Sequence, residues 1–67
     1  MNISQIIKDR HLQLELTQQD LADYTELSLR IIKGIEAGKD NPTFSTLSKI
    51  AEILGLEIIM QVKEVNK

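Results

Sequence analysis

The chain has 67 residues, no cysteine and a formal net charge of −2. This length supports one domain with a small core, and the absence of cysteine excludes disulfides and thiolate metal sites. A single histidine, no phosphate-cradling glycine loop and no long apolar run argue against an enzyme, a metal or cofactor site and a membrane span, so we expect a cytoplasmic protein without catalytic residues.

The first helix is predicted over residues 2–12. Asn2 or Ser4 can cap its N-terminus, because both side chains accept hydrogen bonds from the free N–H groups of a helix start. Its apolar side chains approximate one helical face: Ile3, Ile6, Ile7 and Leu14.

The stretch from Thr17 to Glu36 is predicted to form two short helices joined by a tight turn. Thr17 with Asp20 matches an acidic capping box, and Ser28 is a suitable N-cap for the second helix. The side chains left on the outer face of this second helix are Leu29, Arg30, Lys33 and Gly34. A short helix with a small or basic outer face, braced by another helix, suits insertion into the DNA major groove.

A loop over residues 37–42 and a last helix beginning after Thr43 are expected next. Gly38 can end the preceding helix in the left-handed conformation, and Gly55 can end the last one. The last helix carries a regular apolar stripe, which we expect to be core: Phe44, Leu47, Ile50, Ala51 and Leu54.

The periodicity then changes to two over residues 56–63, which indicates a β-strand. A single strand leaves its backbone N–H and C=O groups unpaired, so we expect two copies to pair in a homodimer. The alternatives are a frayed tail or a further helical turn. The expected dimer contacts are Leu56, Ile58, Ile59, Met60 and Val62.

The segment LTQQDLADYTELSLRIIKGIEAGKDNPTFSTLSKIAEILGL resembles the helix-turn-helix domain of the Cro/C1-type (Xre) repressors. The resemblance implies an all-α, lambda-repressor-like domain of four to five helices over residues 1–55. The strand and tail would occupy residues 56–67. With the strand, the chain is similar to HipB-like antitoxins, which bind a HipA-like kinase toxin and repress their own operon.

The resemblance also implies two kinds of contact with double-stranded DNA. Base edges would be read by Leu29, Arg30, Lys33 and Gly34. Phosphates would be bound by Thr17, Gln18, Ser28, Lys39, Asn41 and Thr43. A dimer would hold two such helices about 34 Å apart, which predicts a pseudo-palindromic operator. The alternative is a protein-interaction module that has lost DNA binding, in which Arg30 and Lys33 are an ordinary solvated face.

Four positions depart from the family or interrupt a helix. Glu15 and Glu26 stand where glycine is common, so we expect another turn geometry at Glu15 and a modest strain at Glu26. His11 replaces a common arginine and either pairs with Glu36 or is a partly exposed residue at a helix end. Gly34 permits close approach of a base pair or of a neighbouring backbone, or is merely tolerated.

Overall fold

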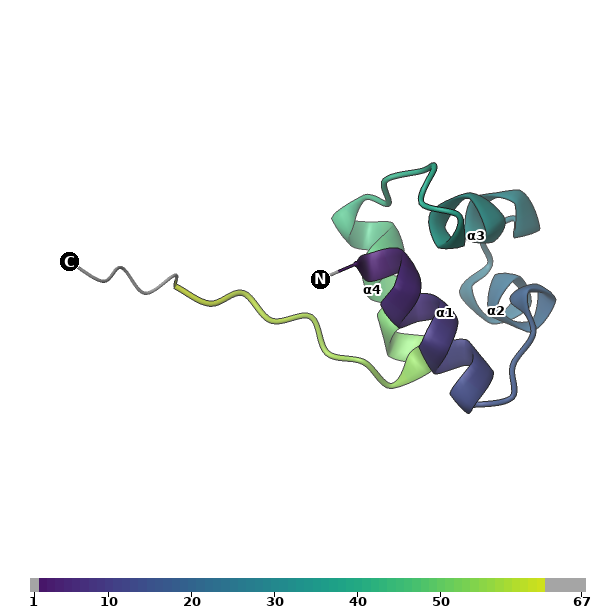
Figure 1. Cartoon of the computed structure of the whole chain (residues 1–67), viewed down its shortest axis with the longest axis horizontal. Helices are drawn as coiled ribbons and strands as arrows, with labels where there is room; N and C mark the ends of the chain where they lie inside the picture. The colour runs from purple at the N-terminus through teal and green to yellow at the C-terminus, as the bar shows by residue number, and fades with distance from the viewer. Residues whose placement is uncertain (1, 63–67) are drawn as a thin grey trace.

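Four helices surround one apolar core in this computed structural model, which describes residues 2–62: α1 (Ile3–Gln13), α2 (Gln18–Thr25), α3 (Leu29–Glu36) and α4 (Phe44–Leu54). Helices α1 and α2 each pack against both α3 and α4 (Figure 1). The core side chains come from all four helices: Ile7, Leu21, Ala22, Ile32, Ile35, Ile50 and Leu54. The predicted all-α helix-turn-helix domain is confirmed.

Each helix begins at the side chain that the sequence predicts. The Asn2 side chain accepts from Ser4 N at 2.9 Å, and the Thr43 hydroxyl accepts from Thr46 N at 3.1 Å. Thr17 and Asp20 form the reciprocal capping box, with both hydrogen bonds at 2.9 Å. These bonds satisfy N–H groups that a helix start cannot pair internally.

Two of the connections use a left-handed residue that is not glycine. Glu15 has φ +58° between α1 and α2, and Glu26 has φ +61° at the end of α2. The expectation of another turn geometry at Glu15 is therefore wrong, because the glutamate itself adopts the conformation that glycine favours. The strain expected at Glu26 is present.

Phe44 is not a core residue, contrary to the sequence prediction, because 67% of its surface is exposed. It is the first residue of α4, and helical side chains lean toward the N-terminus, so its ring projects past the packed part of the helix. Ile3 and Leu14 are likewise exposed near the two ends of α1, and among the four predicted apolar positions on that helix only Ile7 is buried.

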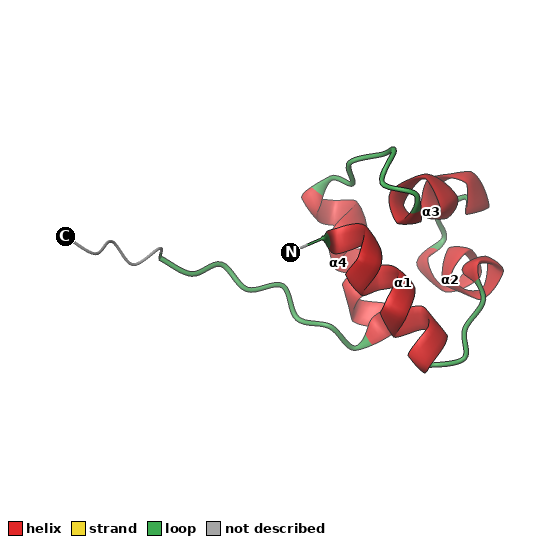
Figure 2. Ribbon diagram, viewed as in Figure 1, coloured by secondary structure: helices red, strands yellow, loops and turns green. Residues whose placement is uncertain are grey.

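Residues 56–62 run away from the helical body without regular secondary structure (Figures 1 and 2). Leu56 packs against the core, whereas Met60 and Val62 are 93% and 98% exposed. The strand predicted over residues 56–63 is thus not formed by the described part of the single chain, in which no second strand can pair with it. Its last residue, Lys63, lies outside the described range.

Within residues 2–62, no helix is long and apolar enough to cross a membrane.

Candidate nucleic-acid interface

The outer face of α3 carries two exposed cations. Ile32 and Ile35 are buried on the inner face, and Arg30 and Lys33 are exposed on other sides of the same helix. Within residues 2–62 neither cation forms a salt bridge. Their charges are therefore available to a ligand.

Leu29 is less accessible than the sequence predicts, whereas Ile31, which has no predicted role, is exposed. Leu29 is half-buried and packs against the core, although it was expected to read a base. Ile31 is 40% exposed and adds an apolar side chain to the accessible part of α3. Residues 29, 32 and 36 are three and four positions apart, so their side chains lie on one side of α3. Leu29 therefore points to the same side as the buried Ile32.

Gln18, at the start of α2, lies against the end of α3. Its Nε2 donates to Glu36 Oε1 at 3.1 Å. The hydroxyls of Thr17 and Ser28 accept cap hydrogen bonds from backbone N–H groups, which leaves each hydroxyl proton free to donate. Three predicted phosphate contacts therefore sit at helix starts, where free N–H groups favour an anion.

The same Glu36 oxygen is the centre of a buried polar network. His11 Nε2 lies 3.0 Å from Glu36 Oε1, and the two side chains are only 6% and 4% exposed. His11 Nδ1 lies 2.9 Å from Leu16 O. Because a carbonyl oxygen only accepts, Nδ1 is the donor in this hydrogen bond. Pairing of His11 with Glu36 is confirmed.

Lys8 joins this region, which the sequence analysis did not anticipate. A hollow of about 190 Å³ is lined by Lys8, Gln18, Lys33, Glu36 and Ala37. No local pattern links Lys8 to α3, and only the packing of α1 on α3 brings it beside Lys33. The inward neighbour, Glu36 Oε2, is buried and has no hydrogen-bond partner among the described residues.

The loop after α3 carries the remaining predicted contacts. Lys39 and Asn41 are exposed, and so is Thr43, whose hydroxyl caps α4 and contacts the Thr46 hydroxyl. Lys39 N and Asp40 N both donate to Gly34 O, at 2.9 and 3.2 Å. These two hydrogen bonds hold the loop directly beside α3.

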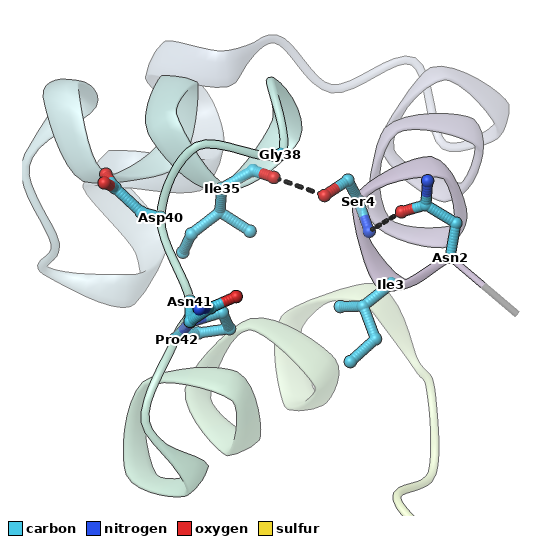
Figure 3. Close-up of a pocket in the computed structure, with 8 residues that line it drawn as sticks. All are labelled: Asn2, Ile3, Ser4, Ile35, Gly38, Asp40, Asn41 and Pro42. Carbon is cyan, nitrogen blue, oxygen red and sulfur yellow. Dashed lines mark hydrogen bonds between the residues drawn. The ribbon is translucent and has the colours of Figure 1, made fainter.

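The opposite side of this loop faces the N-terminus of α1 across a pocket of about 540 Å³ (Figure 3). There Ser4 Oγ donates to Ile35 O at 2.6 Å, which anchors the last turn of α3 to α1. Gly38, with φ +74°, turns the chain out of the helix at this point, as the sequence predicts.

The Asp40 side chain occupies the space beside Gly34 that a Cβ atom would fill. A Cβ atom built at Gly34 would overlap the Asp40 carboxylate, with Asp40 Cγ at only 2.7 Å. The close neighbour is the end of an exposed side chain from the following loop and not a backbone segment, so both interpretations of Gly34 remain predictions. Asp40 had no role in the sequence analysis, because no local pattern links it to α3.

Comparison with known proteins gives a family match over most of the chain. A helix-turn-helix family profile matches residues 3–59. An immunity repressor protein of Bacillus phage phi105 is 36% identical over 64 residues, which is 96% of this chain and 44% of the relative. The chain thus spans less than half the length of that relative. No solved structure matches.

Proposed function

The chain belongs to the helix-turn-helix family, and we propose that it is a dimeric, sequence-specific DNA-binding transcriptional repressor. Helix α3 would lie in the major groove, with α2 across its back. The observation that carries this proposal is the pair of exposed cations on α3, Arg30 and Lys33, without a salt bridge in residues 2–62. The similarity to a phage immunity repressor supports the same role.

Base reading is assigned to Arg30 above all, because a guanidinium donates two parallel hydrogen bonds to guanine O6 and N7. Lys33 lies one turn further along the same helix and can reach a base or a phosphate. Ile31 offers an apolar contact to a thymine methyl group, a role that the sequence assigned to Leu29.

Phosphate binding would flank this helix on both sides. Thr17, Gln18 and Ser28 present a hydroxyl or amide beside free helix N–H groups on one side, and Lys39, Asn41 and Thr43 lie in the loop on the other. Lys8 adds a further cation beside Gln18. Such contacts orient a protein on the duplex, and their cations make affinity salt-dependent.

A second copy of the chain would complete the molecule. Residues 56–62 leave their backbone without strand partners, and Ile58, Ile59 and Met60 are exposed. Pairing of two tails would bury these side chains and place two α3 helices about 34 Å apart on a pseudo-palindromic operator.

A more specific version of this proposal is that the repressor is also an antitoxin with a HipA-like kinase as partner. This version rests on the sequence resemblance alone. Co-purification of the protein with the product of a neighbouring kinase gene would support it. A fold that has lost DNA binding is the remaining alternative, and the following experiment separates it from a repressor.

The test is a mobility-shift titration on the DNA upstream of the protein's own gene, at two salt concentrations. The wild type should bind one duplex in preference to a scrambled one, and the Arg30→Ala, Lys33→Ala double variant should lose that preference while remaining folded. Lys49→Ala, which removes an exposed lysine from α4, is the matched control and should bind like the wild type. A folded wild type that shows no preference at low salt would contradict the proposal.

A further inference from the structure

The Asp40 carboxylate occupies the place where a side chain of residue 34 would begin. Its Oδ2, Cγ and Cβ atoms are the nearest neighbours of a Cβ built at Gly34. The loop is held in this position by the bonds from Lys39 N and Asp40 N to Gly34 O. Asp40 also lines the pocket beside α1, but Figure 3 shows its carboxylate pointing away from Asn2 and Ser4.

Residue 34 lies on the outward side of α3. At 100° per residue, Gly34 follows Arg30 by one turn and points away from the buried Ile32 and Ile35. A side chain at this position would enter the major groove together with Arg30. Glycine removes that side chain, and Asp40 supplies a carboxylate in its place.

The carboxylate has no partner that explains its position. Within residues 2–62, Asp40 is exposed, forms no salt bridge and accepts no hydrogen bond at its side chain. An anion beside bound DNA is repelled by phosphates unless it meets a hydrogen-bond donor. In the major groove the matching donor is the N4 amino group of cytosine, since adenine N6 stands next to the acceptor N7.

We propose that Asp40 is a specificity-determining residue that selects cytosine at one position of each half-site, acting through the gap that Gly34 leaves in α3. This inference rests on the proposed DNA-binding function and adds a base preference to it. Arg30 would set a guanine preference independently, because it is held by a different segment of the chain.

The test is selection of binding sites from a duplex library with randomised positions, using the full chain. Wild type, Asp40→Asn and Asp40→Ala are compared, with Asp9→Asn as the control for loss of one exposed carboxylate; Asp9 accepts from Gln5 on α1. Circular dichroism verifies that each variant is folded.

The wild type should prefer cytosine at one position in each half-site. Asp40→Asn should shift that position toward adenine, because an amide can bond both N6 and N7, and Asp40→Ala should reduce the cytosine preference about fivefold or more. Asp9→Asn should leave the selected sequence unchanged.

Gly34→Ala is a second route to the same effect. The new methyl group would displace the Asp40 carboxylate, so the cytosine preference should fall although the aspartate is retained. Combining it with Asp40→Ala should cause no further loss of preference, because both changes remove one contact.

Two outcomes would overturn the inference and are distinguishable. If the Asp40 variants bind every sequence more tightly with an unchanged base preference, the carboxylate only repels phosphate, and the DNA-binding proposal stands without it. If the folded wild type selects no sequence, the DNA-binding proposal fails, and the inference fails with it.

Discussion

His11 on α1 and Glu36 at the end of α3 form a buried contact, with Nε2 and Oε1 3.0 Å apart. Gln18 of α2 donates to the same oxygen, and His11 Nδ1 bonds Leu16 O in the α1–α2 connection. One carboxylate oxygen therefore joins three helices. Since α2 and α3 carry most of the proposed DNA contacts, this network sets their relative position.

Replacing His11 by alanine should destabilise the fold strongly. The change leaves Glu36 buried without its ring partner, and breaking a buried pair by removing one member costs about 3 kcal/mol or more. For a chain of this size we expect the melting temperature to fall by more than about 10 °C. Thermal unfolding followed by circular dichroism measures the shift, and a fall of only a few degrees would contradict the importance of this contact.

His11→Arg should be tolerated and serves as the rescue variant. A guanidinium carries several donors in a planar fork and can reach both carboxylate oxygens, including Oε2, which has no partner among the described residues. We expect a melting temperature at or above that of the wild type. A loss as large as that of His11→Ala would show that the imidazole's shape, and not its pairing, is what the site requires.

The features that sequence predicts well are local ones. Thr17, Ser28 and Thr43 cap their helices because capping depends on residues two or three positions apart. Gly38 and Gly55 end theirs for an equally local reason, their tolerance of positive φ.

Features that depend on packing between segments were predicted poorly. The overlap of Asp40 with the space above Gly34 and the approach of Lys8 to Lys33 both require the path of the chain in three dimensions. Phe44 fits the apolar spacing of α4. This spacing predicts which face of the helix a side chain lies on, but it does not predict whether another element covers the first turn of α4.

Phe44→Ser should change the unfolding free energy by no more than about 0.5 kcal/mol, because the ring is exposed. Leu54→Ala, in the core of the same helix, should cost about 2–5 kcal/mol and is the matched comparison. Chemical denaturation at a low protein concentration measures both. A cost for Phe44→Ser close to that of Leu54→Ala would show that the ring is covered in solution.

Glycine at either left-handed glutamate should stabilise the protein. Glu15→Gly and Glu26→Gly each relieve the steric cost of a positive φ, and the larger chain entropy of glycine offsets part of that gain. We expect a net gain of about 0.5–1 kcal/mol for each, measured by denaturant unfolding.

The control for these changes is Glu52→Gly, which places the same substitution inside α4 at an exposed helical position. It should lose about 1 kcal/mol, because glycine is a poor helix former. If all three variants lost stability alike, the strain assigned to Glu15 and Glu26 would be wrong.

Lys39→Ala should weaken DNA binding nearly equally for all sequences. The lysine is exposed in the loop after α3 and is assigned to a phosphate, so its removal should reduce the slope of log affinity against log salt by about 1. Arg30→Ala should instead reduce the preference for one base. Binding isotherms on specific and scrambled duplexes over a range of salt test both, and a sequence-dependent effect at Lys39 would reassign it to base reading.

The tail should be the element that dimerises the protein, and Met60→Asp tests this. Met60 is almost fully exposed in the single chain, so a charge there costs the folded monomer little. Between two paired tails the same charge would be buried near its symmetry mate, which is unfavourable. We expect the wild type to sediment as a dimer and Met60→Asp as a monomer with unchanged helix content.

Tyr24→Asp is the control, because Tyr24 is also exposed and apolar but lies on α2, outside the tail. It should remain dimeric. A monomeric wild type at concentrations where it binds operator DNA would contradict the dimer, and each half-site would then have to bind one chain independently. If Tyr24→Asp dissociated the dimer and Met60→Asp did not, the dimer interface would lie on α2 and not in the tail. The spacing between the two α3 helices would then differ, and so would the expected operator.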